Sequence, residues 1–187
     1  AFGNMGAYQG YAAVAYPQGQ LLSWTTLEKG GILVGETGRR FGNEDLGYSG
    51  FAAHVLDQGE FAWAIYDARI HDIAEAEEEY AEMATMGAVS WAETPAALAA
   101  QVGLDAGGLT ETIAAYNRAA LDDGTDEFGR KAFALAPLQP PFAAVRVKPG
   151  LFHTQGGVLV DNEARVRRLT GGTVPNLFAG GGAASGI

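Results

Sequence analysis

Strand-forming segments lie at both ends of this sequence, and helix-forming segments lie between them. Residues 1–35 have a glycine every few positions and short apolar runs, Tyr11–Tyr16 and Gly31–Val34, which favours strands and turns over helix. Residues 49–135 show mostly helical patterns, and strand signals return after Pro137. This order predicts an α+β fold.

The middle of the chain is expected to hold several helices. Thr94 followed by Pro95, for example, is an N-cap with proline in the first turn. A compact aromatic and β-branched run at 61–66 predicts a strand among these helices. The polar segment 36–45 is of the kind that joins two strands. The expected helices cover 49–56, 71–86, 95–103 and 109–121.

The last part of the chain is expected to be rich in short strands, at 142–147, 157–160, 166–169 and 177–179. The final strand, which has a buried type of sequence, leads into a turn of three glycines. Such a turn elsewhere opens a helix, but the sequence stops at Ile187 without one. We therefore expect the chain to be part of a longer fold.

Charge and composition exclude several classes of partner and site. Twelve Lys and Arg against 22 Asp and Glu give a net charge of −10, whereas binding to nucleic acid or to an anionic membrane needs a basic face. The sequence has no cysteine, which excludes disulfides, iron–sulfur clusters and thiolate zinc sites. No apolar run approaches the roughly 20 residues of a membrane-spanning helix, and the first residues lack the basic region of a signal peptide. We expect a soluble, cytoplasmic protein.

Two glycine-rich segments could carry chemistry. Leu177–Ile187 leads an apolar strand into a glycine turn, where backbone N–H groups can approach a phosphate or cofactor closely. Phe152–Gly157 combines the polar groups of His, Thr and Gln with a pair of glycines. Taken alone, both are more simply explained as tight polar turns, since neither is a G-x-G-x-x-G or Walker A sequence.

No metal site and no hydrolase site is predicted. His54, His71 and His153 do not have the spacing of metal ligands. The six carboxylates between Asp72 and Glu82 favour a solvated helix face. The sequence also lacks the G-x-S-x-G elbow that would present a nucleophilic serine.

The segments taken in order resemble the flavoproteins of the fumarate reductase and succinate dehydrogenase family. The most specific matches are GRRFGNE at 38–44, HTQGG at 153–157 and PNLFAGGG at 175–182, and the resemblance covers nearly the whole chain. It implies FAD as cofactor, and an FAD-binding α/β domain interrupted by a mobile capping domain of helices and strands, with the substrate between them.

The resemblance also implies how the chain is divided. Residues 21–145 would form the capping domain, 1–20 a returning segment of the flavin domain, and 146–187 its incomplete C-terminal part. The strand–GxGxxG–helix that holds the FAD pyrophosphate in this family is not in the sequence. The missing half of the flavin domain would therefore be supplied in cis by a longer chain.

Site residues are inferred from the resemblance only at matching positions. His153 and Thr154 match a His-Thr pair that hydrogen-bonds a substrate carboxylate or carbonyl, so we expect His153 to be catalytic and Thr154 to bind substrate. Ser23 aligns with a substrate-binding Thr. The expected flavin contacts are Gly156, Gly157, Ala179, Gly180 and Gly181.

The sequence departs from fumarate reductases at their proton-donating positions. Tyr48 stands where they have the Arg that protonates the substrate. Trp24 and Leu27 stand for the Glu and Arg of the proton path, and Tyr16 for a His. Fumarate reduction itself is therefore not expected. Ketosteroid dehydrogenases similar to this family exchange a proton through a Tyr, so Tyr48 is the expected catalytic acid or base. The alternative is a packed aromatic beside the GRRF turn.

The resemblance thus implies part of an FAD-dependent dehydrogenase or reductase that exchanges a hydride with a carbon next to a carbonyl or carboxylate of a small-molecule substrate. The apolar and aromatic replacements favour a larger and less anionic substrate than a dicarboxylate. One alternative is an isolated, non-catalytic capping-domain fragment that binds no flavin alone. A small-molecule binding domain without flavin would require both glycine segments to be coincidental turns.

Overall fold

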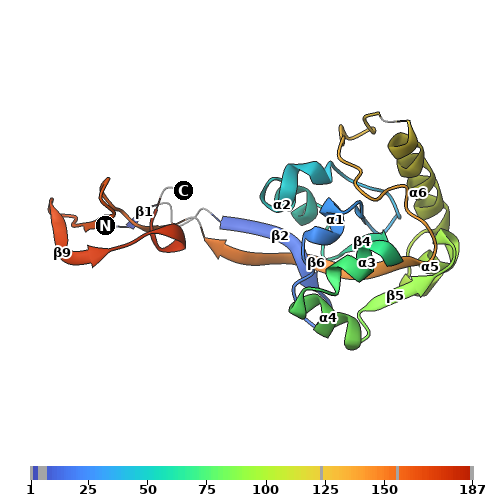
Figure 1. Ribbon diagram of the computed structural model, residues 1–187, viewed down its shortest axis with the longest axis horizontal. Helices are drawn as coiled ribbons and strands as arrows, with labels where there is room; N and C mark the ends of the chain where they lie inside the picture. Colours follow the sequence, from blue (N-terminus) through green and yellow to red (C-terminus); the bar gives the residue numbers. More distant parts are fainter. Residues whose placement is uncertain (1, 4–7, 123, 155, 186–187) are drawn as a thin grey trace. The chain divides into compact units, whose positions relative to one another are not determined.

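The computed structural model describes residues 2–3, 8–122, 124–154 and 156–185 (Figure 1). Its contacts divide the chain into two compact units, which we call the larger unit (Tyr11–Gly150) and the smaller unit (Ala1–Gly10 with Leu151–Ile187). The boundaries expected from the sequence lie nearby, after residues 20 and 145. The assignment of these units to a capping domain and a flavin domain stays a prediction.

The larger unit is built on a five-stranded sheet in which β6 (Phe142–Thr154) is the central strand. The order β2-β6-β4-β3 forms the main path, and β5 also pairs with β6. The pairs β3–β4, β4–β6 and β5–β6 are antiparallel. Every residue of β3 and β4 is buried, so both faces of these strands are covered. The other strands are β2 (Tyr8–Ala15), β3 (Ile32–Val34), β4 (Ala62–Asp67) and β5 (Val89–Ala92).

Six helices and one 3₁₀ turn are described in the larger unit (Figure 1). Capping side chains start three of the helices. Asp67 accepts hydrogen bonds from the backbone at the start of α3, and Thr94 and Asp105 do the same for α5 and α6. The elements are α1 (Thr25–Glu28), η1 (Glu44–Leu46), α2 (Gly47–Leu56), α3 (Ala68–Ala74), α4 (Glu78–Thr85), α5 (Pro95–Val102) and α6 (Ala106–Leu121).

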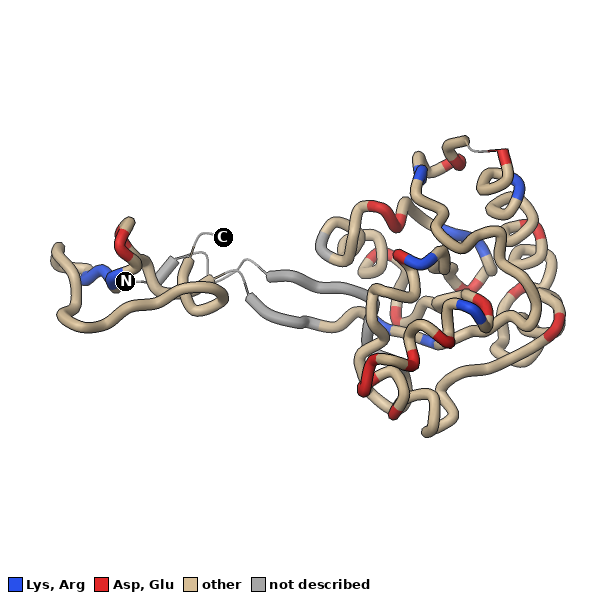
Figure 2. Tube along the Cα trace, viewed as in Figure 1, with Lys and Arg blue, Asp and Glu red and all other residues tan. Residues whose placement is uncertain are grey.

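The helix expected over 71–86 is two helices, α3 and α4, with a break between them. A continuous helix would place Glu75 and Glu79 four residues apart on one face, where like charges repel. The break avoids this alignment, and the carboxylates around it are mostly exposed along α3 and α4 (Figure 2). The solvated acidic face expected from the sequence is therefore present, but on two short helices.

Two other expectations differ from the structure. Residues 36–45 do turn back on themselves, with an isolated bridge between Val34 and Arg40, but the chain then enters η1 and α2 instead of a strand. A short helix, α1, also lies within the first 35 residues, where only strands and turns were expected. Its four residues are too few to give a periodic signal.

The smaller unit consists of short strand pairs. β1 (Phe2–Gly3) pairs with β7 (Gly157–Val158), and β8 (Arg165–Arg167) pairs with β9 (Thr173–Phe178). A 3₁₀ turn, η2 (Gly181–Ala183), follows β9. The strand expected at 177–179 is present, but Leu177 and Phe178 are 48% and 61% exposed, because no described element of this unit covers them.

Candidate functional site

The expected site residues belong to both units of the chain. Ser23 and Tyr48 lie in the larger unit, and the five expected flavin contacts lie in the smaller one. His153 and Thr154 are the last two residues of β6, and their side chains are outside the described part of the structure. We describe the two groups separately.

In the larger unit, a cavity of about 370 Å³ lies beside α1, η1 and the start of α2. Trp24 and Leu27, which stand at the proton-path positions, line it together with Gly47, the residue before Tyr48. Tyr48 is in the first turn of α2 and is 41% exposed. The structure therefore brings together the segments that carry Trp24, Leu27 and Tyr48, whereas Tyr16, the other substituted position, lines a different cavity. The other described lining residues are Glu28, Glu44, Asp45 and Ala132.

Ser23 stands just before α1 and is held by that helix. Its Oγ accepts a hydrogen bond from the backbone N–H of Thr25 at 3.2 Å and donates to Thr25 Oγ1 at 3.0 Å. The Ser23 carbonyl also accepts a bond from Thr26 Oγ1. These bonds fix the start of α1 and leave Ser23 half-buried.

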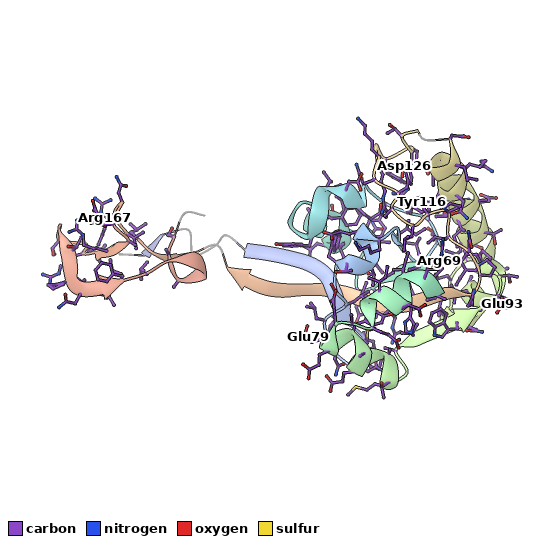
Figure 3. The ribbon with its side chains drawn as sticks, in the orientation of Figure 1. Arg69, Glu79, Glu93, Tyr116, Asp126 and Arg167 are labelled. Carbon is purple, nitrogen blue, oxygen red and sulfur yellow. The ribbon has the colours of Figure 1, made fainter. Side chains whose placement is uncertain are left out.

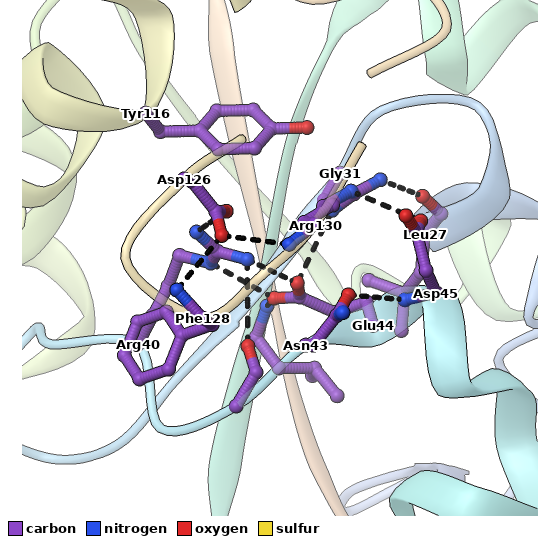
Figure 4. Close-up of polar contacts among 12 residues, drawn as sticks. Leu27, Gly31, Arg40, Asn43, Glu44, Asp45, Tyr116, Asp126, Phe128 and Arg130 are labelled. Atoms are coloured by element: carbon purple, nitrogen blue, oxygen red, sulfur yellow. Dashed lines mark hydrogen bonds and ion pairs between the residues drawn. The ribbon is translucent and has the colours of Figure 1, made fainter. Parts of the chain in front are cut away.

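One lining residue of this cavity, Glu44, is a buried carboxylate, and Figure 4 shows its polar contacts. Its Oε1 accepts hydrogen bonds from the backbone N–H of Leu33 at 3.0 Å and from Arg40 Nε at 3.1 Å. Its Oε2 accepts from Arg40 Nη2 at 2.5 Å and from Arg130 Nη1 at 3.3 Å. Arg40 also pairs with Asp126 at 2.5 Å. Each charged group therefore has an opposite charge at hydrogen-bond distance, as buried charges require.

Arg130 connects this ion cluster to the backbone around the cavity. Its guanidinium donates to the carbonyl oxygens of Leu27 at 2.7 Å, Gly31 at 2.8 Å and Ala132 at 2.9 Å. The Leu27 bond holds the end of α1, and the ion pair with Glu44 holds η1. Arg130 thus sets the relative position of the two elements that flank the cavity.

Tyr116 of α6 closes the other side of the cluster (Figures 3 and 4). The guanidinium carbons of Arg40 and Arg130 lie 5.1 and 5.3 Å from the centre of its ring, and its hydroxyl donates to the carbonyl of Gly30 at 3.0 Å. Burial raises the pKa of Tyr116 well above its ordinary value. Burial also works against the charge of Arg40, but its bonds to Glu44 and Asp126 more than offset this and raise its pKa.

These contacts make the ion cluster a scaffold for the cavity. Its carboxylates and guanidinium groups are mutually paired. Tyr48 follows the lining residue Gly47, and its side chain is partly exposed. Three carboxylates and no lysine or arginine occur among the described lining residues. Glu44 and Asp45 are paired with Arg130, so Glu28 is the lining carboxylate whose negative charge would disfavour a ligand with two carboxylate groups.

In the smaller unit, the two glycine segments meet. Val158 forms a parallel bridge with Ala184, and Ser185 donates its backbone N–H to the carbonyl of Val158 at 2.9 Å. A Cβ on Gly157 would lie 2.5 Å from the carbonyl oxygen of Ala183, which explains the glycine there by close packing. The resemblance had implied close approach to a flavin for this glycine. Gly156, its neighbour, is buried.

The glycines after β9 are open instead. A Cβ built on Gly180 or Gly181 would meet no atom within 4 Å. Ala179 is held by its backbone N–H, which bonds to the carbonyl of Ala164 at 3.0 Å. An exposed backbone without side chains is what a large flat cofactor needs for close contact. This open backbone is compatible with the flavin contacts that the resemblance implies, which stay a prediction.

The ion cluster as a unit was not predicted from the sequence. Arg40 and Glu44 fall in the GRRFGNE segment, but their partners Asp126 and Arg130 are 86 residues further along the chain. The available signal was two pairs of opposite charges, Arg40 with Glu44 and Asp126 with Arg130, each four residues apart in a segment with phenylalanine and glycine. The sequence does not show that these two segments meet in the folded chain.

The described histidines do not form a metal site. No group of three or more potential ligands occurs among the described residues. His71 instead makes a 2.7 Å hydrogen bond with Tyr80, a 3.2 Å contact with Glu75 and an edge-on contact with Trp91. His54 packs against the ring of Phe51.

Comparison with known proteins identifies the class of this chain. A profile of the FAD binding domain family matches residues 10–187. The chain belongs to this family. The expected flavoprotein class and its cofactor, FAD, are thereby confirmed.

Individual relatives show more particular similarity. The chain is 30% identical over 186 residues to NADH:fumarate oxidoreductase of Klebsiella pneumoniae (strain 342), covering 98% of this chain and 20% of that protein. It is 31% identical over 183 residues to 4-oxocyclohex-2-ene-1-carboxylate 5-dehydrogenase of Sinomonas cyclohexanicum, covering 83% of this chain and 31% of that protein. A solved flavocytochrome c3 fumarate reductase in its open conformation matches with a TM-score of 0.74 and 28% identity, covering 100% of this chain and 33% of that one.

These matches confirm the α+β fold class and the likeness to fumarate reductase flavoproteins. The chain spans about a fifth of the length of the Klebsiella relative. No helix among the described residues is long and apolar enough to cross a bilayer. The roles of the individual site residues stay predictions.

Proposed function

We propose that this chain supplies the capping domain and the C-terminal part of the flavin domain of an FAD-dependent dehydrogenase or reductase, which acts on a carbon–carbon bond next to a carbonyl. The supporting observation is the cavity beside Tyr48, which has apolar and acidic lining residues and, among those described, no cation. A dicarboxylate such as fumarate would be disfavoured there, and a neutral cyclic ketone would not. The printed name of the Sinomonas relative describes as substrate a ring ketone that carries one carboxylate group, and not a dicarboxylate.

The residues of this chain would divide the work as follows. FAD, when bound, supplies the hydride donor or acceptor. His153 and Thr154 would hydrogen-bond the carbonyl oxygen, which stabilises the negative charge that develops there. The Tyr48 hydroxyl would move the proton at the carbon next to that carbonyl. Ser23 would bind the substrate from the start of α1, and Arg130 and Glu44 would hold α1 and η1 in place.

The substrate class can be tested by flavin bleaching in the full-length protein. We expect a cyclic ketone, or its α,β-unsaturated analogue, to change the flavin spectrum, and succinate and fumarate to leave it unchanged. Bleaching by succinate without any response to ketones would show that the substrate is a dicarboxylate.

The role of Tyr48 can be tested by Tyr48→Phe in the same protein. We expect turnover of the responding ketone to fall by about 10²- to 10⁴-fold, the usual contribution of a general acid or base. Exchange of the hydrogen next to the carbonyl, followed by NMR in D₂O, should be lost in parallel. Tyr80→Phe removes the same hydroxyl from a buried tyrosine away from this cavity and should keep both rates. Unchanged turnover in Tyr48→Phe would remove Tyr48 from the mechanism.

A further inference from the structure

Arg146 of β6 is the half-buried arginine of the larger unit that has no acidic partner among the described residues. Arg40 and Arg130 pair with Glu44, and Arg69 pairs with Asp67. The guanidinium of Arg146 instead lies over two aromatic rings, 4.5 Å from the centre of the Tyr16 ring and 4.8 Å from that of Phe61. In a chain with 22 acidic residues, this arrangement leaves a cation available for an anion from solution.

The two rings position the cation. They contact each other with centres 5.0 Å apart, so the guanidinium is held against an aromatic corner. Lys148, two residues along the same strand, places its Nζ 5.5 Å from the centre of the Tyr16 ring. Cation–π contacts of this kind order an arginine without neutralising it.

A cavity of about 270 Å³ adjoins Arg146. Strand pairing explains its floor, since Trp63 is opposite Arg146 across the β4–β6 ladder and Ser90 is opposite Ala144 across the β5–β6 ladder. Apolar and neutral polar groups complete the wall. The other described lining residues are Tyr16, Pro17, Gln18, Gly87, Ala88, Gln101 and Val102.

The charge of this cavity is opposite to that of the two other described cavities of the larger unit. Arg146 is its one charged lining residue among those described. The cavity beside Tyr48 has three carboxylates, and the cavity beside Tyr116 has three carboxylates against Arg40 alone. An arginine fork facing an otherwise neutral, partly apolar cavity is suited to a carboxylate on a small organic body.

We propose that the Arg146 cavity is a binding site for the carboxylate of a small, partly apolar organic acid. The guanidinium takes the carboxylate as a two-point hydrogen-bonded pair, and Trp63, Ala144 and Val102 contact the carbon skeleton. The site is lined by the 16–18 turn, β4, β5, α5 and β6, and it shares no described lining residue with the cavity beside Tyr48. The proposal does not depend on the proposed function.

Titration calorimetry of the full-length protein with benzoate tests this site, and benzamide serves as a neutral probe of the same shape. We expect benzoate to bind at least tenfold more tightly than benzamide. Arg146→Gln should weaken benzoate binding at least tenfold. Arg118→Gln, which removes an exposed arginine from α6, should leave it unchanged.

A second variant and a second signal make the outcome decisive. Ser90→Leu keeps Arg146 but fills part of the cavity, so it should also weaken benzoate binding. The flavin spectrum should not change as benzoate binds, because the site is separate from the proposed substrate site. Equal binding of benzoate and benzamide, full binding by Arg146→Gln, absence of benzoate binding, or a flavin shift that saturates with the binding curve would each overturn the proposal.

Discussion

At the scale of single residues, the ion cluster around Glu44 determines how the cavity beside Tyr48 is held. Glu44 accepts four hydrogen bonds from the three residues Leu33, Arg40 and Arg130. Its removal would leave a backbone N–H unpaired and two buried guanidinium groups with fewer anions. A buried ion pair adds little to the free energy of unfolding when it is compared with a well-packed apolar pair. Removing one partner alone is costly, because the other charge stays buried without compensation.

We expect Glu44→Gln to lower the free energy of unfolding by about 3–5 kcal/mol. Glu111→Gln is the matched control, because it breaks the surface pair between Glu111 and Arg39, whose side chains are 67% and 55% exposed, and should cost less than about 1 kcal/mol. Urea unfolding followed by tryptophan fluorescence measures both, since all three tryptophans of the chain lie in the larger unit. Equal losses in the two variants would contradict the scaffold role of Glu44.

At the scale of elements, capping residues and turn glycines in the sequence correctly predicted where individual helices begin and end. Thr94 with Pro95, and Gly103 in the left-handed conformation, start and end α5 as expected. The strand β4 also follows the sequence prediction, and β6 begins at Phe142 as expected but continues past residue 147 to Thr154. The break between α3 and α4 was missed, because apolar spacing continued through it while crowded carboxylates opposed one long helix. The ion cluster was missed because its halves meet only when α6 and the segment after it fold back on η1.

Buried tyrosines join the helices to the sheet, and they predict a loss of stability at alkaline pH. Tyr66 of β4 and Tyr80 of α4 share a 2.7 Å hydrogen bond, and burial raises the pKa of both, as it does for Tyr116 of α6. The ordinary value is 10.0. Below pH 10, the tyrosines are protonated in both the folded and the unfolded chain, and their full contribution to the free energy of unfolding is present. Above it, the unfolded chain releases protons that the folded chain retains, so stability falls with rising pH.

We therefore expect the free energy of unfolding to fall by about 1.4 kcal/mol per pH unit for each of the three tyrosines above about pH 10. Urea unfolding at a series of pH values measures the slope. Tyr116→Phe should reduce this tyrosine contribution by about a third. The tyrosinate absorbance of the three buried tyrosines should appear at the same pH at which the far-UV circular dichroism is lost. Ionisation of all tyrosines before unfolding would show that the three hydroxyls are accessible in the folded chain.

At the scale of the whole molecule, the two units of the chain differ in what they contain. The larger unit has a well-formed core and a scaffolded cavity, and its proposed substrate residues depend on the resemblance. The smaller unit brings together three parts of the sequence. β1 pairs with β7 at the end of the first glycine segment, and Val158 of β7 forms a bridge with Ala184 in the second. The sequence predicted both segments, but not that Gly157 packs on η2 while Gly180 and Gly181 stay open. That difference depends on backbone positions, which composition does not determine.

The open glycines give the last prediction, which concerns FAD itself. Gly180 has an extended backbone, φ −152° and ψ 177°, in which a β-branched side chain is unstrained, and its Cβ direction is empty. Gly180→Val should therefore fold normally in the full-length protein, yet its side chain would occupy the space that the expected flavin contact requires. We expect FAD affinity to fall at least tenfold, a change of about 1.4 kcal/mol or more.

The ratio of flavin to protein absorbance after purification measures FAD retention, and circular dichroism checks the fold. Asn162→Val introduces the same side chain at an exposed turn of the same unit and should retain FAD. If Gly180→Val keeps its full FAD content, the flavin does not lie against Gly180. The open backbone after β9 would then serve only as a turn.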